Sequence, residues 1–261
     1  MKELSWNDPE VRNELTRLKQ MKPFCYGLTN YIAANLSANV LLAVGAGPAI
    51  GTAMDWPSVF GGHAHAVWIN AASLMSCGPD EIRLAAKSAH EGGVPWVLDP
   101  VAVGAGAAEY DAVVRGLLEF KPTAIRGNAS ELIALAGGDG GGQGVETTMT
   151  SDQAVPFLAK VAAEIGTIAA VSGPVDYITD GTSTYAVGGG DERLTQVTGA
   201  GCSLGALMAG MLANAEDPIM AVVAAHAVYA EAANRAKSAV GTGSFAVSFL
   251  DHLSLIDPSE A

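Results

Sequence analysis

The residues with the clearest chemical potential form a glycine-rich turn, Val-Thr-Gly-Ala-Gly-Cys, at Val197–Cys202. Small and apolar residues follow over 203–213 and predict a helix with Cys202 in its first turn. Backbone N–H groups at a helix start lack internal partners and carry partial positive charge, and glycines let a phosphate approach them. The turn therefore predicts an anion hole beside a nucleophile or proton acceptor, Cys202. The alternative is a tight loop into a buried helix with an inert cysteine. The predicted members of the anion hole are Gly199, Ala200, Gly201 and Cys202.

A carboxylate, Asp99, directly follows the apolar run Trp96–Leu98, which predicts a strand. In a parallel sheet, ligands gather at the carboxyl ends of the strands. Asp99 could hold magnesium through water or accept a proton from a substrate. It could also simply fix the loop or cap a helix.

A guanidinium, that of Arg126, ends another expected strand, Ala124–Arg126. Asn128 and Glu131 follow with the spacing of a capping box, which is a structural explanation for both. Beside them, however, Arg126 could bind a nucleotide phosphate, and a carboxylate such as Glu131 could order hydrated magnesium.

A hydroxyl, that of Ser172, stands with Gly173 at the end of the expected strand Thr167–Val171. It could contact phosphates or merely begin a turn. Each of these signals is modest alone. Asp99, Arg126, Ser172 and the Gly199 turn nevertheless all fall at expected carboxyl ends or in the loops beyond. This shared placement favours phosphoryl transfer.

The elements that must position these residues alternate between strands and helices. This order predicts an α/β three-layer sandwich with a mostly parallel central sheet and flanking helices, as one domain over residues 1–261. Asp180-Gly181 predicts a hairpin at the sheet's edge, and the glycine-rich stretch 137–144 predicts a surface loop. The expected strands are Phe24–Leu28, Ala66–Asn70, Trp96–Leu98, Ala124–Arg126, Thr167–Val171, Asp176–Thr179 and Ser183–Val187. The expected helices are Asp8–Lys19, Ile32–Val44, Asp80–Glu91, Tyr110–Phe120, Ser130–Ala136, Asp152–Ile165, Cys202–Ala213, Ile219–Ser238 and Ser244–Leu255.

The composition excludes several classes of protein. A formal net charge of −13 over 261 residues argues against nucleic acid and anionic membrane as partners. No Gly-x-x-x-x-Gly-Lys-Ser/Thr motif occurs, which excludes a P-loop. The three cysteines lack metal-ligand spacing, and no signal-peptide pattern or membrane-length apolar stretch is present, so we expect a cytoplasmic protein. His63 and His65 fit a solvated loop better than a metal site.

Taken together, the motifs resemble hydroxyethylthiazole kinase, a thiamine-salvage family with the ribokinase-like fold. The resemblance covers nearly the whole chain, and the order and spacing of so many blocks make it specific. The blocks are Thr29-Asn30-Tyr31 with Asn35 and Asn39, Gly45–Pro48, Asp99–Val101, Arg126–Glu131, Ser172-Gly173 with Asp176–Gly181, and Val197–Cys202.

The resemblance implies ATP-dependent phosphorylation of the primary alcohol of 4-methyl-5-(2-hydroxyethyl)thiazole, with magnesium. By motif, Arg126 and Ser172 would contact ATP, and Gly199 would lie at the thiazole. Cys202 would occupy the place where many ribokinase-like relatives carry an aspartate base. The family resemblance also implies a homotrimer with sites at subunit interfaces.

The chain departs from the family pattern at several positions. Ile50 stands where a thiazole-contacting methionine is usual, and it keeps apolar volume without the thioether. Ser172 replaces a threonine and keeps the hydroxyl, and Pro174 replaces a glutamate. Ala102 and Gly106 differ from the usual glycine and threonine.

Three alternatives remain open. One is a hydroxymethylpyrimidine-type kinase, against which the segment Thr29–Pro48 argues. Another is a nucleotide-dependent hydro-lyase on the same fold, which would usually have aspartate where this chain has Cys202. The last is a non-catalytic oligomeric binding protein.

Overall fold

A nine-stranded sheet runs through the molecule in the order β1-β9-β8-β7-β6-β5-β4-β2-β3. The computed structural model describes residues 1–138 and 150–260. Strands β3, β2, β4, β5, β6 and β7 are parallel to one another, while β8 runs antiparallel to β7 and β9. The strands are β1 (Lys2–Glu3), β2 (Phe24–Leu28), β3 (Gly47–Ile50), β4 (Ala66–Asn70), β5 (Trp96–Asp99), β6 (Ala124–Gly127), β7 (Ile168–Val171), β8 (Val175–Thr179) and β9 (Thr184–Gly188).

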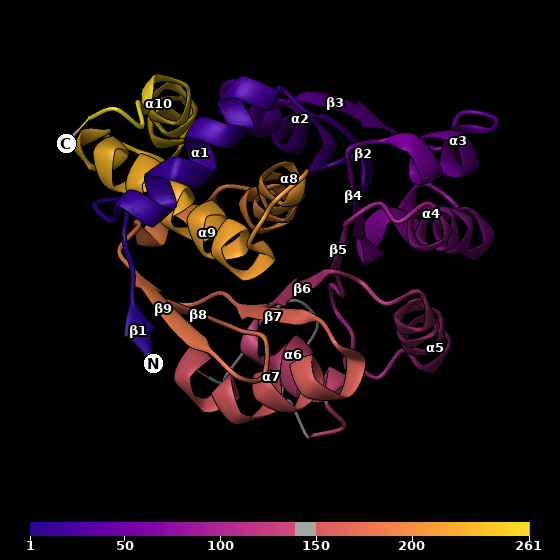
Figure 1. Cartoon of the computed structure of the whole chain (residues 1–261). Helices are drawn as coiled ribbons and strands as arrows, with labels where there is room; N and C mark the ends of the chain where they lie inside the picture. The colour runs from indigo at the N-terminus through magenta and orange to yellow at the C-terminus, as the bar shows by residue number, and fades with distance from the viewer. Residues whose placement is uncertain (139–149, 261) are drawn as a thin grey trace.

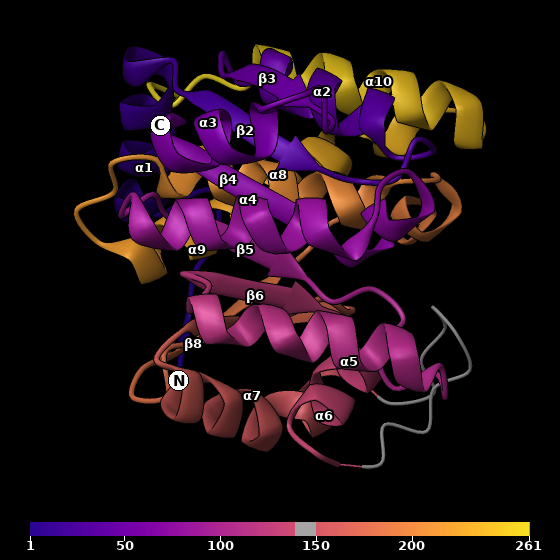
Figure 2. The same ribbon diagram turned by 90° about the vertical axis from the view of Figure 1, so that its right-hand side faces the viewer.

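Helices cover both faces of this sheet. In Figure 1, α1, α2, α8, α9 and α10 lie on one side, and α3 to α7 lie on the other; Figure 2 shows α4, α5 and α7 from the front. The α-helices are α1 (Pro9–Met21), α2 (Ala34–Ala43), α3 (Trp56–His63), α4 (Pro79–Glu91), α5 (Ala108–Gly116), α6 (Ala129–Leu135), α7 (Ser151–Ile165), α8 (Ala200–Leu212), α9 (Pro218–Arg235) and α10 (Thr242–Leu255). Short 3₁₀ turns are η1 (Ala71–Met75), η2 (Leu117–Phe120), η3 (Glu192–Gln196) and η4 (Ala236–Ser238).

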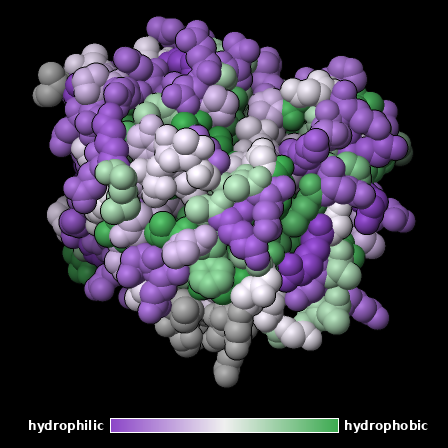
Figure 3. All heavy atoms as spheres, turned by 60° about the horizontal axis from the view of Figure 1, so that its bottom comes forward, coloured by the Kyte–Doolittle hydropathy of each residue, from purple (hydrophilic) through white to green (hydrophobic). Residues whose placement is uncertain are grey.

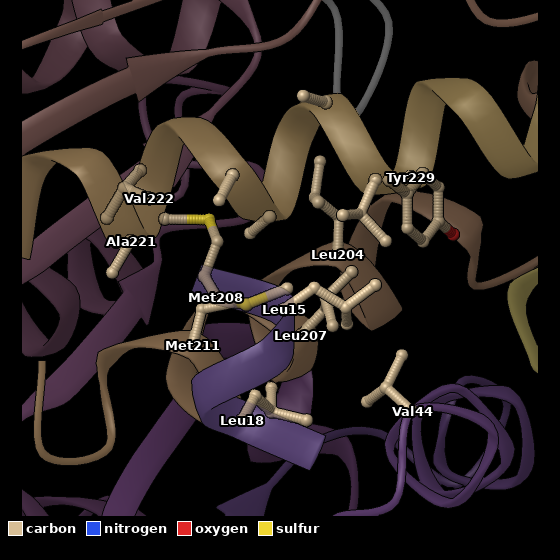
Figure 4. Packing of buried hydrophobic residues seen from close by; sticks show 14 of the residues in the cluster. Leu15, Leu18, Val44, Leu204, Leu207, Met208, Met211, Ala221, Val222 and Tyr229 are labelled. Atoms are coloured by element: carbon tan, nitrogen blue, oxygen red, sulfur yellow. The ribbon is translucent and has the colours of Figure 1, made fainter. Parts of the chain in front are cut away.

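Two hydrophobic clusters, one on each side of the sheet, hold the layers together. The larger one packs α8 and α9 against α1 and α2, with Leu15, Met208 and Val222 fully buried (Figure 4). Alanine, glycine and valine dominate α8 and α9, so these helices can approach closely. Central strands are buried on both faces, which explains why they read as continuous apolar runs.

The expected α/β sandwich with a mostly parallel sheet is confirmed. Three elements were missed: the two-residue strand β1, the edge strand β3 and helix α3. Strand β3 contains Pro48, which a strand tolerates at the edge of a sheet because the missing N–H faces away from the ladder. Of the expected loop 137–144, Gly137 and Gly138 follow α6 and residues 139–144 lie outside the described part.

Across the described residues, none of the helices combines the length and apolar character needed to cross a membrane. The face drawn in Figure 3 is largely hydrophilic, and its hydrophobic residues form small separate groups.

Candidate active site

The carboxylate of Asp99 lies at the carboxyl end of β5 and is 3% exposed. Register pairs it with Asn70, the last residue of β4, whose Nδ2 donates to Asp99 Oδ2 at 3.0 Å. Arg126 Nη1 reaches the same oxygen at 3.4 Å. Among the described residues, Asp99 Oδ1 has no hydrogen-bond partner although it is buried. Burial raises the pKa of Asp99 to about 7, against the opposing charge of Arg126.

The guanidinium of Arg126 joins three parts of the structure. It sits on β6, pairs with Asp99 of β5, and donates from Nε to Ser172 Oγ, just beyond β7, at 3.1 Å. A Cβ added to Gly201 would lie 3.1 Å from Arg126 Nη1, so the first turn of α8 packs directly on the guanidinium. The predicted cleft residues Arg126 and Cys202 therefore share one site.

The turn before α8 requires glycine at Gly199. Its φ is +83°, and a Cβ there would lie 3.0 Å from Ala33 Cα, just before α2. Within the predicted anion hole, the N–H of Ala200 already donates to Val197 O at 3.1 Å. Of the four predicted members, Gly199, Gly201 and Cys202 therefore keep N–H groups that could meet a phosphate.

The thiol of Cys202 is less acidic than the helix start suggested. Burial raises its pKa to about 11; Asp99 adds to the shift, while Arg126 and Asn70 oppose it. A helix N-terminus generally lowers the pKa of a thiol, but here burial and the carboxylate of Asp99 raise it. At neutral pH Cys202 is a protonated thiol.

Glu131 has the structural role that its spacing indicated. Its two carboxylate oxygens accept the N–H groups of Asn128 at 2.8 Å and Ala102 at 2.9 Å, completing a capping box and fixing the loop after β5. Ala102 there has φ +63°, a left-handed conformation, where the family pattern has glycine. Burial raises the pKa of Glu131.

The carboxylate oxygens of this site fit a magnesium ion that is bound mainly through water and substrate phosphates. Among the described residues, no group of three or more His, Cys, Asp or Glu could hold a metal. Asp99 Oδ1 is nevertheless a buried carboxylate oxygen without a partner, and Glu131 lies near enough to affect the pKa of Asp99. Magnesium is commonly held by one or two carboxylates and waters together with substrate phosphates, so the residues fit an ion bound in that way.

In a single chain, Ile50 lies far from the cluster of Asp99 and Arg126. It ends β3, the last strand at one edge, and is partly buried. Four strand spacings separate β3 from β6, so Ile50 lies about 19 Å from Arg126 across the sheet. His63 and His65 are also apart from the cluster: His63 ends α3, and His65 Nδ1 accepts the N–H of Phe24 at 3.0 Å.

Several buried polar residues beside the site were missed. Asn70 could have been found by the reasoning that selected Asp99, since it is a polar residue that ends an expected strand. Asp176 and His226 form a pair 2.7 Å apart, and Tyr229 contacts the start of α8. His226 and Tyr229 carry no local signal, because their partners are 26 to 50 residues away in sequence. Asp176 stands in one of the blocks of the family resemblance, but its pairing with His226 was not predicted.

Comparison with known proteins agrees with this geometry. A model of the hydroxyethylthiazole kinase family matches residues 15–259. A hydroxyethylthiazole kinase of Burkholderia thailandensis is 61% identical over 260 residues, covering all of both chains. The solved structure of a hydroxyethylthiazole kinase from Pyrococcus horikoshii superposes with a TM-score of 0.85 at 34% identity, covering 95% of this chain and 93% of that one.

A more distant structure supports the fold alone. Bacillus subtilis pyridoxal kinase, solved as an ADP complex, matches with a TM-score of 0.64 at 18% identity over 82% of this chain and 92% of its own. The sheet order, the polar cluster at its carboxyl edge and the full-length matches together show that this chain belongs to the hydroxyethylthiazole kinase family.

Proposed function

We propose that this protein transfers the γ-phosphoryl group of ATP to the primary alcohol of 4-methyl-5-(2-hydroxyethyl)thiazole, a step of thiamine salvage. The observation that carries the proposal is the position of Arg126, whose guanidinium contacts Asp99, Ser172 and the first turn of α8 together. A buried cation between a hydroxyl and a helix start suits a triphosphate.

In the proposed reaction, the alcohol oxygen attacks the γ-phosphorus, the bond to the β-phosphate oxygen breaks, and ADP leaves. Arg126 and Ser172 hold the triphosphate, and the N–H groups of Gly201 and Cys202 stabilise charge on the transferred group. With its raised pKa, Cys202 is a poor base and serves as a weak donor within the turn. Little early deprotonation is needed in a loose transition state, so the alcohol's proton can pass late to an oxygen of the transferred phosphoryl group and from there to water.

Magnesium would be held at Asp99, through its free Oδ1, with Glu131 ordering the surrounding water. When bound, it would neutralise charge on the β- and γ-phosphates. Asn70 and Arg126 keep the Asp99 carboxylate oriented toward that role.

The remaining parts of the proposal concern assembly and location. Ile50 is proposed to contact the thiazole together with Gly199 in a homotrimer whose sites lie at subunit interfaces. The edge that carries β3 supports this, because Tyr31 is 68% exposed and Met54 is 97% exposed. One continuous sheet with two helical layers supports one domain. The three free cysteines support a cytoplasmic protein, and the acidic charge argues against nucleic-acid partners.

Product analysis by mass tests the proposal. The purified protein is incubated with ATP and, in turn, the thiazole alcohol, hydroxymethylpyrimidine and hydrated NADH, each with magnesium or with EDTA. We expect phosphate addition to the thiazole alcohol with magnesium only. Preferential phosphorylation of the pyrimidine, loss of water from the hydrated cofactor, or ATP binding without turnover would each contradict the proposal.

A further inference from the structure

Helix α9 presents a buried histidine to the turn that follows β7. His226 is 1% exposed, and its Nδ1 lies 2.7 Å from Asp176 Oδ2. The other oxygen of Asp176 accepts the N–H of Gly173 at 2.8 Å. A carboxylate oxygen accepts, so Nδ1 carries the proton and donates. The contacts form a chain from α9 through Asp176 to the backbone beside Ser172.

One helical turn further along α9, Tyr229 reaches the other turn of the site. Its hydroxyl donates to the carbonyl of Ala200 at 2.7 Å and lies 2.8 Å from Ser203 Oγ, which also donates to that carbonyl. Figure 4 shows the Tyr229 ring among the apolar side chains of the core. The tyrosine therefore fixes the first turn of α8 through the Ala200 carbonyl.

His226 and Tyr229 are polar residues in a helix whose other buried residues are apolar, and His226 carries an energetic cost there. The other fully buried residues of α9 are alanines and valines, with Met220 nearly as buried. His226 Nε2 is buried without a hydrogen-bond partner among the described residues, a penalty that an apolar residue would avoid. Residues three apart lie on one helix face, so a single rigid element contacts both turns.

We propose that His226 and Tyr229 are positioning residues: through Asp176 and the Ala200 carbonyl, they fix the Ser172–Gly173 turn relative to the turn before α8. The inference rests on the proposed binding of ATP at these two turns. His226 acts on nucleotide affinity, since Gly173 neighbours the hydroxyl that contacts Arg126. Tyr229 acts on turnover, since it holds the turn that faces the transferred group.

The histidine is tested by comparing His226→Ala with His226→Asn. The asparagine Nδ2 can take the place of Nδ1–H and restore the donor to Asp176. We expect His226→Ala to raise the KM for ATP about tenfold, on the order of one hydrogen bond to a charged group, with the KM for the thiazole alcohol unchanged. His226→Asn should keep the KM for ATP within about twofold of wild type.

Packing is controlled with Val228→Ala, a fully buried residue of the same helix. This variant should lower the Tm and leave the KM for ATP unchanged. Tyr229→Phe keeps the ring and removes the hydroxyl; we expect kcat to fall about fivefold, the scale of one neutral hydrogen bond, with a smaller change in the KM for ATP.

Three outcomes would overturn the inference. If His226→Ala has the wild-type KM for ATP while Arg126→Ala has a raised one, this inference is wrong and the proposed nucleotide site stands. An equal rise in the KM for ATP in His226→Ala, His226→Asn and Val228→Ala would mean that His226 contributes only to core packing. An unchanged KM for ATP in Arg126→Ala would overturn the proposed nucleotide site and this inference together.

Discussion

The two ends of the parallel sheet are built from the same strands and differ in chemistry. At the carboxyl ends, the buried carboxylates Asp99 and Glu131 and the largely buried Arg126 form one small cluster of ionisable groups. At the amino ends, before β4, β5 and β6, lies an open hollow of about 420 Å³ with no acidic residue, lysine or arginine in its lining. The hollow is lined by Met21, Ala64, His65, Gly93, Val94, Pro95, Thr123, Leu212, Asn214, Ala215 and Pro218.

The difference indicates that the proposed phosphate site is marked by charge and helix direction and not by open volume. The amino-end hollow contains the C-terminus of α8, where the helix dipole is negative. The carboxyl end receives the N-terminus of the same helix and a guanidinium that is 12% exposed. These charges agree with the proposed binding of ATP at the carboxyl end and argue against binding of a triphosphate at the amino end.

The largest effect is expected at the carboxyl end for Arg126→Ala. Loss of a charge-assisted phosphate contact costs about 1.5–3 kcal/mol, which should raise the KM for ATP about 10- to 100-fold. Steady-state kinetics with varied ATP measures this. Thermal unfolding serves as the control, because the variant also leaves Asp99 without its ion-pair partner. Unaltered ATP kinetics would give this arginine a purely structural role.

Removal of the thiol should have a smaller effect. We expect Cys202→Ala to lower kcat about tenfold, or about 1.4 kcal/mol, with the KM for ATP unchanged. Cys77→Ala is the matched control, since its half-buried thiol donates to Ser73 O in η1, away from the Arg126 cluster. Turnover at the wild-type rate in Cys202→Ala would remove this thiol from the mechanism.

The buried carboxylate predicts a pH dependence of stability. Burial raises the pKa of Asp99 from 3.8 to about 7, so between these values the folded state holds a proton that the unfolded state has released. The stability that Asp99 contributes is therefore complete below about pH 4 and is lost as the pH rises through about 7. We expect the free energy of unfolding of wild type relative to Asp99→Asn to fall from pH 5 to pH 8.

Urea unfolding without magnesium at several pH values measures this difference. Asp191→Asn is the control of opposite sign: the hydrogen bond from Arg193 lowers the pKa of Asp191 to about 2, so its contribution is constant above pH 5. A flat difference for Asp99→Asn over the same range would mean that the carboxyl is ionised throughout.

The smallest effect is expected at the amino end for Thr123→Val. Thr123 Oγ1 accepts the N–H of Trp96 at 3.1 Å, so its loss should cost about 1 kcal/mol of stability. Kinetic constants for ATP and the thiazole alcohol should be unchanged. A raised KM for ATP would place nucleotide binding at the wrong end of the sheet for our proposal.

Much of the carboxyl end could be predicted from the sequence. Asp99, Arg126 and Ser172 each follow a short apolar run, and the strand-end rule gathers such residues at one edge. The hairpin at Asp180-Gly181 was predicted for the same kind of reason, since its turn chemistry is local. The fold class follows from these regularities, whereas the family was identified by the resemblance of the motif blocks.

The remaining features depend on how deeply a residue is buried and on contacts between residues that are far apart in sequence. The pKa of Cys202 could not be predicted because the helix dipole and desolvation oppose each other, and only burial decides between them. His226 and Tyr229 lie in an unbroken apolar helix, and nothing local indicates which turns they contact. Strand β3 was missed because Pro48 argues against a strand until its edge position is known.

A crystal structure of this chain with ADP and the thiazole alcohol bound tests the central claim most directly. Our account predicts density for the diphosphate at the carboxyl ends of β6 and β7, within hydrogen-bonding distance of Arg126 and facing the first turn of α8. Nucleotide bound in the amino-end hollow, or away from Arg126 altogether, would contradict it.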